Sequence, residues 1–307
     1  MILILGVTAS GKSRLAFDLA EHLGAEILSI DSMKVYRRMD IGTAKPPKEA
    51  RQRVKYHLID LVEPSDSFSV GAFIDAALDA IGQIKSRNRK IVAVGGTALY
   101  IKSLLYGLFD GAGTDEHIRT ELRARAEAEG LAELHRELMK IDPAAAERIN
   151  PNDARRIIRA LEVYQLTGKP ISSFQKQWDQ HQIRHDWTII GLRREKADAS
   201  SRINKRVKKM IDAGLVDEVK YLLNEEKPLG NQARCAIGYA EIIEHLSGQT
   251  SLEDAIESIK INSRRLAKDQ RTWFKTFQNV HWLDIAEDET SEQILARTKR
   301  LLDEIIA

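Results

Sequence analysis

Short apolar runs alternate with amphipathic stretches along much of the chain. Residues 1–5, 26–30, 90–94 and 187–192 are apolar runs of the length of a strand. The first run is followed by a glycine-containing loop and then by apolar residues at helical spacing, and the third run shows the same order. Strands that alternate with helices predict an α/β fold, with a parallel sheet and helices on both of its faces.

The amphipathic stretches predict the helices of this core. Apolar residues recur at helical spacing over residues 15–23, 70–85 and 98–106. Later in the chain, residues 200–224 form an amphipathic helix or pair of helices with a break at Gly214, and residues 256–277 form a long basic helix. After Trp282 we expect only acidic residues and a short apolar helix.

The pattern changes between residues 114 and 186. Helical periodicity covers residues 115–130, 131–141 and 153–167, with prolines between these segments and no strand pattern until residue 187. We therefore predict an all-helical insertion domain at 114–186 in a core domain made of 1–113 and 187–307.

The sequence G-x-x-x-x-G-K-S follows the first apolar run and precedes the first amphipathic stretch. Its glycines allow a tight turn whose amides point at one anion, and the next helix adds the positive end of its dipole. Lys12 can reach the outer phosphate, and the Ser13 hydroxyl can bind Mg²⁺. The predicted fold is therefore P-loop NTPase-like, and the loop is a site for a di- or triphosphate, such as ATP or another nucleotide. Its residues are Gly6, Val7, Thr8, Ala9, Ser10, Gly11, Lys12 and Ser13.

Two polar residues follow the predicted second and third strands. Asp31 comes directly after residues 26–30, and Thr97 follows Gly95 and Gly96 after residues 90–94. Ligands of open α/β sheets bind at the carboxyl ends of the strands, so both side chains should lie near the phosphate loop. Asp31 can act as a base there, or it can cap the next turn. Thr97 can contact a ligand, cap a helix, or do both.

Composition narrows the class of protein. The chain has 307 residues, one cysteine and a formal net charge of +2. A single cysteine excludes a disulfide framework, and the apolar runs are too short for a signal peptide or a membrane span, so we expect a cytoplasmic protein. Basic residues cluster at 155–159, 205–209 and 264–271. Each cluster can be the solvated face of a helix, but three of them beside a phosphate loop favour nucleic-acid binding.

Seven strings of the sequence carry a family resemblance. They are, in order, GVTASGKS, DSMKVYRRMDIGTAKP, HLIDLVEP, VGGTALY, NPNDARRIIRALEVY, AIGYAE and LAKDQRTWF. Together they resemble the bacterial tRNA dimethylallyltransferases, also called tRNA isopentenyltransferases, over nearly the whole chain. The resemblance implies a prenyltransferase that modifies tRNA. It would move a dimethylallyl group from dimethylallyl diphosphate to the exocyclic amine of the adenosine immediately 3′ of the anticodon.

The resemblance also implies roles for individual residues. In the family the loop holds the diphosphate of the prenyl donor, with Mg²⁺, and ATP is not the substrate. Asp31 would take or polarise the amine proton, Thr97 would bind the bridging oxygen of the diphosphate, and Arg119 would lie near the diphosphate. The insertion domain would contact the anticodon stem-loop of the tRNA. We expect the protein to be a monomer that binds no membrane and has no obligate protein partner. The tRNA-binding residues implied are Asp31, Ser32, Met33, Lys34, Arg155, Arg156, Ile157, Ile158 and Arg159.

Four positions depart from the family pattern. Val7, Lys34, Cys235 and Asp269 stand where Pro, Gln, Gln and Arg are usual. Lys34 has the largest consequence, because an ammonium group donates hydrogen bonds but accepts none, whereas Gln does both.

Three other functions share part of this pattern. A P-loop kinase of small molecules would need an arginine-rich lid, which we cannot assign between residues 107 and 190. An enzyme that prenylates free AMP or ADP would not need the helical insertion with its arginines at 155–159. A third alternative is an RNA-binding protein without catalysis. Replacing Asp31 would leave RNA affinity intact in either case, but only an enzyme would lose turnover.

Overall fold

The computed structural model describes residues 1–107, 113–174 and 183–306. The chain divides into two compact units, and one of them is made from both ends of the sequence. Unit 1 comprises Met1–Leu105 and His185–Ala307, and unit 2 comprises Tyr106–Arg184. The sequence pattern puts these boundaries at 113/114 and 186/187.

A six-stranded parallel sheet forms the centre of unit 1 in the described residues. Its strands are β1 (Ile2–Gly6), β2 (Glu26–Ile30), β3 (Tyr56–His57), β4 (Ile91–Gly95), β5 (Thr188–Arg194) and β6 (Val280–Ile285). They lie in the order β3-β2-β4-β1-β5-β6. The predicted α/β class with a parallel sheet is confirmed. The central strands are buried on both faces, which explains their continuous apolar runs.

The register of the sheet brings three sequence segments to one edge. Leu5 of β1 and Ile30 of β2 both lie opposite Gly95 of β4. The residues that follow these strands are therefore neighbours at the carboxyl edge of the sheet. The strand order also reverses at β1, and a crevice outside the sheet at such a point is the usual ligand site of this architecture.

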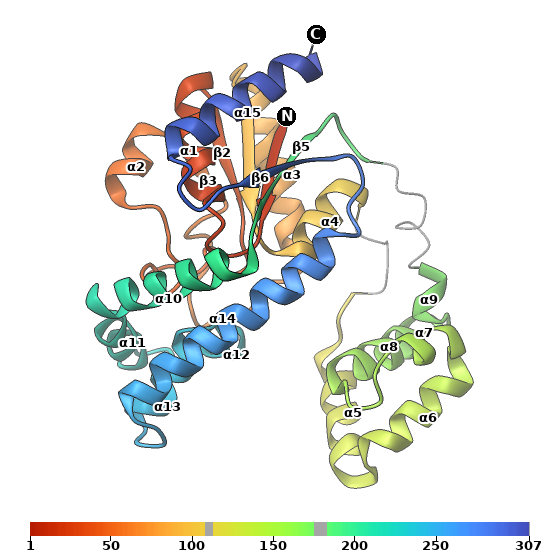
Figure 1. Cartoon of the computed structure of the whole chain (residues 1–307). Helices are drawn as coiled ribbons and strands as arrows, with labels where there is room; N and C mark the ends of the chain where they lie inside the picture. The colour runs from red at the N-terminus through yellow and green to blue at the C-terminus, as the bar shows by residue number, and fades with distance from the viewer. Residues whose placement is uncertain (108–112, 175–182, 307) are drawn as a thin grey trace. The chain divides into compact units, whose positions relative to one another are not determined.

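Helices cover both faces of the sheet. In Figure 1, α1 (Lys12–Leu23) and α15 (Ser291–Ile306) lie on one face, and α3 (Val70–Ser86) and α4 (Ala98–Tyr106) lie on the other. The short helix α2 (Lys48–Arg53) precedes β3. The strands and helices α1 and α15 share one apolar core, to which β1, β2 and β4 contribute alternate residues because side chains alternate across a strand.

A second group of helices in unit 1 lies beyond the carboxyl edge of the sheet (Figure 1). It consists of α10 (Lys196–Asp212), α11 (Leu215–Leu223), α12 (Asn231–Arg234), α13 (Tyr239–Leu246) and α14 (Leu252–Phe274). Helix α14 packs against both α10 and α13. This layer closes over the edge where the three predicted site segments meet.

Unit 2 is helical throughout its described residues and has its own apolar core. Its helices are α5 (Glu116–Glu129), α6 (Leu131–Ile141), α7 (Pro143–Arg148), α8 (Ala154–Thr167) and α9 (Ile171–Phe174). Pro143 begins α7, although proline in the sequence suggests a break between helices. The first position of a helix tolerates proline because its amide has no acceptor there, and the Asp142 side chain caps the same turn.

The tail after Trp282 also differs from the expectation. Residues Val280–Ile285 form the edge strand β6, paired in parallel with β5. His281 and Asp284 are exposed on this edge strand, so its sequence lacks the apolar run that marks a central strand.

Candidate functional site

The loop between β1 and α1 has the geometry of an anion site. Gly11 adopts φ +99° and Ala9 adopts φ 62°, so two residues of this short loop are in the left-handed region. Within the described residues, the amides of Gly11, Lys12 and Ser13 have no hydrogen-bond acceptor in the protein. They lie at the amino-terminal end of α1, where the helix dipole also attracts a negative charge. An incoming phosphate would supply the missing acceptor.

The protonation state of the Lys12 amine depends on whether an anion is bound nearby. Its Nζ donates to the Val7 carbonyl oxygen at 3.1 Å, within the loop. Burial, together with the nearby charges of Arg206 and Lys34, lowers the pKa of Lys12 to about 7, against a smaller opposing effect of Asp31. A bound anion would remove this electrostatic penalty and favour the protonated form.

Four side chains from elements distant in the sequence form hydrogen bonds with the loop. The Gln270 side chain on α14 accepts from the Thr8 amide at 2.7 Å and donates to the Gly96 carbonyl at 2.9 Å. Arg202 and Arg206 on α10 donate to the Ala9 carbonyl and the Thr8 hydroxyl, each at 2.9 Å. Arg194 on β5 donates to the Ser10 carbonyl at 3.0 Å. Sequence reasoning missed Gln270, Arg194 and Arg202, because each lies more than 180 residues from the loop and in no local phosphate motif.

Asp31 has one carboxylate oxygen occupied and one available. Its Oδ1 accepts from the amides of Met33 at 2.9 Å and Lys34 at 3.2 Å, so the residue caps the turn that follows β2. In the described part of the chain, Oδ2 has no donor. The two uses of Asp31 considered from the sequence are therefore compatible, since one oxygen fixes the side chain and the other is available to a ligand.

Thr97 bonds the turn after β2. Its Oγ1 accepts from the Ser32 amide at 3.1 Å and lies 3.4 Å from the Ser32 hydroxyl. This bond joins the ends of β2 and β4. Thr97 also directly precedes α4, and its carbonyl oxygen accepts from the Ile101 amide at 3.0 Å.

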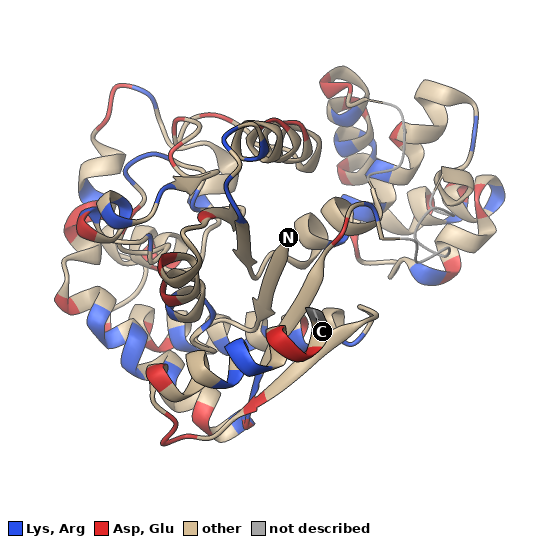
Figure 2. Cartoon of the chain, turned by 90° about the horizontal axis from the view of Figure 1, so that it is seen from above, with Lys and Arg blue, Asp and Glu red and all other residues tan. Residues whose placement is uncertain are grey.

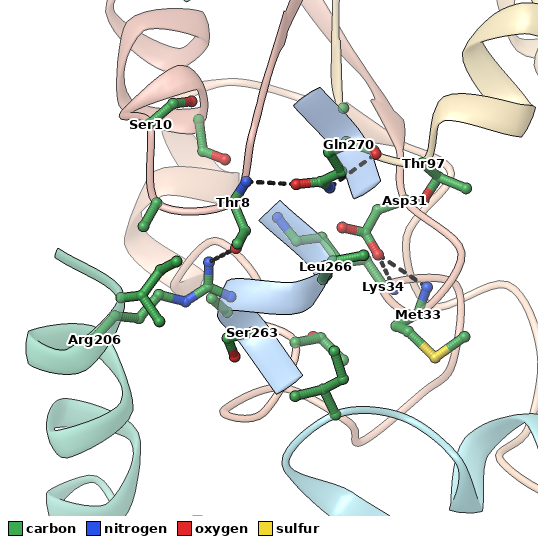
Figure 3. Close-up of a pocket in the computed structure, with 18 of the residues that line it drawn as sticks. Thr8, Ser10, Asp31, Met33, Lys34, Thr97, Arg206, Ser263, Leu266 and Gln270 are labelled. Atoms are coloured by element: carbon green, nitrogen blue, oxygen red, sulfur yellow. Dashed lines mark hydrogen bonds between the residues drawn. The ribbon is translucent and has the colours of Figure 1, made fainter. Parts of the chain in front are cut away.

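A single cavity of about 810 Å³ in unit 1 brings these groups together. Figure 3 shows Thr8, Ser10 and Arg206 on one side of it and Asp31, Lys34 and Thr97 on the other. Burial and the surrounding cations lower the pKa of Lys34, while Asp31 opposes that effect. Apolar side chains complete the walls; they are Met33, Leu99, Ile203, Val207, Met210, Ile237, Ile259, Leu266 and Trp273. The cavity therefore combines a cationic end with an apolar lining and two carboxylates, those of Asp31 and Asp269.

Gly95 at the end of β4 and Gly96 directly after it lie close to other parts of the protein. A Cβ on Gly95 would lie 2.1 Å from the Ile30 carbonyl oxygen, and a Cβ on Gly96 would lie 2.6 Å from Gln270 Nε2. These glycines allow β2 and α14 to approach the turn, so their absent side chains make room for protein atoms.

The remaining predicted residues belong to unit 2, where an acid holds two of them together. The Glu162 carboxylate, which is fully buried, binds Arg119 Nε at 2.9 Å and Arg159 Nη1 at 2.7 Å. Arg155 and Arg156 are exposed on the same helix, α8. Ile157 and Ile158 are on its inner side, in the core of unit 2, so their side chains serve packing.

A second hollow, of about 580 Å³, lies between α10 and α14. No acidic residue lines it, and within the described residues none of its basic side chains forms an ion pair. These side chains are Lys196, Arg264, Arg265, Lys268, Arg271 and Lys275. Elsewhere basic and acidic residues are interspersed on the helices (Figure 2). We refer to this hollow as the basic hollow.

Two further observations limit the chemistry. No cluster of three or more histidine, cysteine or acidic residues that could hold a metal ion occurs in the described residues. Across residues 1–107, 113–174 and 183–306, every helix is too short or too polar to cross a membrane.

The chain is similar to known proteins along almost its whole length. The family model described as IPP transferase matches residues 34–277. A tRNA dimethylallyltransferase of Geobacter metallireducens is 45% identical over 284 residues, which cover 92% of each chain. Another, from Acetivibrio thermocellus, is 42% identical over 303 residues, covering 98% of this chain and 97% of the relative.

Solved structures show the same similarity. The tRNA isopentenylpyrophosphate transferase of Bacillus halodurans is 41% identical with a TM-score of 0.69, over 99% of this chain and 96% of that one. A eukaryotic dimethylallyltransferase acting on tRNA is 27% identical with a TM-score of 0.82, over 99% of this chain and 79% of that one.

Proposed function

The chain belongs to the IPP transferase family, and on this premise we propose that its cavity transfers a dimethylallyl group from dimethylallyl diphosphate to the adenosine immediately 3′ of the anticodon in tRNA. The resemblance found in the sequence is confirmed, as is the class of enzyme, a tRNA prenyltransferase. One observation carries the residue-level proposal: a cationic amide loop and a carboxylate with a free oxygen face the same cavity.

The loop would bind the diphosphate of the donor. The free amides of Gly11, Lys12 and Ser13 give directional hydrogen bonds, and Lys12 gives a charge that strengthens as the anion binds. These groups are held in place before the reaction by Gln270 and the arginines of α10. Preorganised donors stabilise the charge that develops on a leaving diphosphate as its carbon–oxygen bond breaks. The apolar lining suits the prenyl group.

Asp31 would face the attacking amine. The exocyclic amine of adenine is a weak acid, so full deprotonation before attack is unfavourable. The free Oδ2 can instead accept a proton from the amine while the carbon–nitrogen bond forms. Capping by Oδ1 keeps the carboxylate pointed at the cavity, and Thr97 holds the same turn against β4. We further propose that the Thr97 hydroxyl binds the bridging oxygen of the diphosphate.

Orientation would supply a large part of the rate. A nucleophile held in line behind the leaving group gains about 7–11 kcal/mol from proximity and alignment. The adenosine must leave its stack to enter the cavity, which costs a few kcal/mol. Contacts with the rest of the tRNA have to offset that cost.

A divalent cation fits the loop. The Ser13 hydroxyl would bind an ion such as Mg²⁺, which keeps several waters and binds phosphate oxygens. When bound, the ion would add positive charge at the diphosphate.

Contacts with tRNA would come from both units. In unit 2, Arg155, Arg156 and Arg159 are proposed to bind the anticodon stem-loop, with Arg119 near the donor, while Ile157 and Ile158 support the helix. In unit 1, Ser32, Met33 and Lys34 line the cavity beside Asp31 and are proposed to contact the target nucleotide. The unpaired cations of the basic hollow can add contacts to RNA phosphates.

The decisive assay offers the protein two acceptors. Purified protein is incubated with dimethylallyl diphosphate, Mg²⁺ and either a tRNA anticodon stem-loop or AMP, and the prenylated product is measured. We expect transfer to the stem-loop and none to AMP. Transfer to AMP alone would show that the acceptor is a free nucleotide.

A further inference from the structure

The loop from Met39 to Lys45 forms part of the cavity wall without regular secondary structure of its own. Gly42, Thr43 and Ala44 line the cavity, close to the turn that Asp31 caps. Residues 41–44 are in turn conformation, and Ala44 adopts φ 50°. The loop closes on itself through the Ala44 amide, which donates to the Ile41 carbonyl at 3.0 Å, and the Lys45 amide, which donates to the Asp40 carbonyl at 2.9 Å. Side chains from elsewhere in unit 1 add to these bonds.

One carboxylate gathers the amides of this loop. The Glu218 side chain on α11 accepts from the amides of Asp40 at 3.0 Å, Ile41 at 2.8 Å and Gly42 at 3.2 Å. It also accepts from the Tyr239 hydroxyl at 2.6 Å. Four donors therefore meet on one ionised group, and such charge-assisted bonds are about twice as strong as neutral ones.

Tyr239 fits the loop sterically as well. It is fully buried, and a Cβ on Gly42 would lie 2.3 Å from its Cε2 atom. Only glycine lets the loop backbone lie against this ring. Burial, and then the neighbouring Glu218, raise the pKa of Tyr239, so its hydroxyl stays protonated and remains a donor.

A second set of contacts fixes the far end of the loop. Lys45 is buried, and its Nζ binds Asp60 Oδ1 at 2.6 Å and Asp40 Oδ1 at 2.8 Å. The end at Lys45 is therefore anchored to the region after β3, whereas the middle is held by α11 and α13. Loss of the contacts to α11 and α13 would release the part that lines the cavity and leave the anchor at Lys45 in place.

We propose that Glu218 and Tyr239 are positioning residues that shape the acceptor side of the cavity by holding the 39–45 loop. This inference rests on the proposed function. Neither residue touches the phosphate loop, so the donor side is held by a separate set of contacts. The prediction is a selective effect on the RNA substrate.

The test compares Glu218→Gln and Tyr239→Phe with the unchanged protein. Initial rates are measured while either the stem-loop or dimethylallyl diphosphate is varied. We expect the KM for the stem-loop to rise about tenfold in Glu218→Gln and less in Tyr239→Phe, which removes one bond of the four. The KM for the donor should change less than about twofold.

Charge provides a sharp control. Glu218→Gln removes a negative charge, which by general electrostatics should strengthen binding to RNA. Asp217→Asn on the same helix makes the same charge change at an exposed residue, and the described structure gives its side chain no hydrogen bond or ion pair. A weaker RNA interaction in Glu218→Gln alone would therefore report on the loop.

Two measurements separate a displaced loop from a general loss of fold. Thermal unfolding detects the loss of fold, and Gly42→Ala displaces the loop from the Tyr239 ring while both contact residues stay intact. Direct stem-loop affinity is measured for every variant. An unchanged stem-loop KM and affinity, or an equal rise in the donor KM, would overturn the positioning role. Absence of transfer in the unchanged protein would instead refute the proposed function, and the stem-loop affinities would still decide the role of Glu218.

Discussion

Two loops on the cavity wall of unit 1 gather backbone amides in opposite ways. In the loop from Gly6 to Ser13, the amides of Gly11, Lys12 and Ser13 have no acceptor in the described protein. In the loop from Met39 to Lys45, three successive amides bind the Glu218 carboxylate. Under the proposed function, one loop would take its anion from the ligand, whereas the other takes it from the protein.

This difference in hydrogen bonding suggests different roles for the two loops, ligand binding for the first and shaping of the cavity wall for the second. Amides without an acceptor are costly when buried, and a bound diphosphate would supply the missing hydrogen bonds. Amides already paired with Glu218 offer nothing to a ligand, but the loop that carries them has a fixed form. We infer that the first loop binds the donor and that the second presents a surface to the acceptor.

Replacing Lys12 should give the largest effect. Lys12→Ala removes the cation of the first loop, so we expect kcat/KM for dimethylallyl diphosphate to fall by about 1000-fold. The stem-loop affinity should be nearly unchanged, because Glu218 and the second loop are intact. Steady-state kinetics and RNA binding by fluorescence anisotropy measure the two quantities. A donor KM and kcat equal to those of the unchanged protein would contradict the role of the loop.

Asp31 lines the same cavity as the two loops, and its replacement should affect chemistry alone. In Asp31→Asn the remaining oxygen can still cap the amides of Met33 and Lys34, so the turn should keep its form. We expect kcat to fall by about 100-fold while the donor KM and stem-loop affinity stay similar. Single-turnover rates measure the effect. An unaltered rate would remove Asp31 from the mechanism.

Gln270 tests how far the first loop depends on distant support. Gln270→Ala leaves the Thr8 amide and the Gly96 carbonyl without partners, so we expect the free energy of unfolding to decrease by about 1–3 kcal/mol. The donor KM should rise more than the stem-loop KM. Urea unfolding and kinetics give both values, and Gln83→Ala, at an exposed residue of α3, is the matched control. Equal changes in both KM values would argue against separate support of the two loops.

The smallest expected effect is proton uptake by Lys12 when diphosphate binds. With a pKa of about 7, free Lys12 is roughly nine-tenths neutral near pH 8, and a bound anion should restore its proton. Diphosphate binding should therefore be coupled to proton uptake by Lys12, and affinity should fall as the pH rises above about 7. Calorimetry of inorganic diphosphate in buffers of different ionisation enthalpy measures the uptake. In Lys12→Met, any proton uptake on binding comes from groups other than Lys12, including the ligand. An equal number of protons taken up by both proteins would contradict this coupling.

The same pH range has a consequence for stability. Because the pKa of Lys12 is lowered in the folded protein, the unfolded chain holds more protons between about pH 7 and the ordinary lysine pKa of 10.5. This group therefore favours folding increasingly as the pH rises through that window.

Sequence reasoning was most accurate where structure depends on neighbours in the chain. The phosphate loop, Asp31 and Thr97 each follow a buried strand, and strand ends of a parallel sheet meet at one edge, so their meeting in one cavity could be predicted. The α8 pattern likewise separates exposed Arg155 from buried Ile157. The edge strand β6 was missed because its exposed residues break the apolar run.

The amino-acid sequence by itself determined the parallel α/β core and the family, because these follow from periodicity and from contiguous motifs. Only the tertiary structure decided which distant side chains complete the site. Gln270 reaches the phosphate loop across 262 positions, and Glu218 reaches the amide of Asp40 across 178. Such contacts have no local signature, because hydrogen bonds between distant segments depend on how helices pack on the sheet.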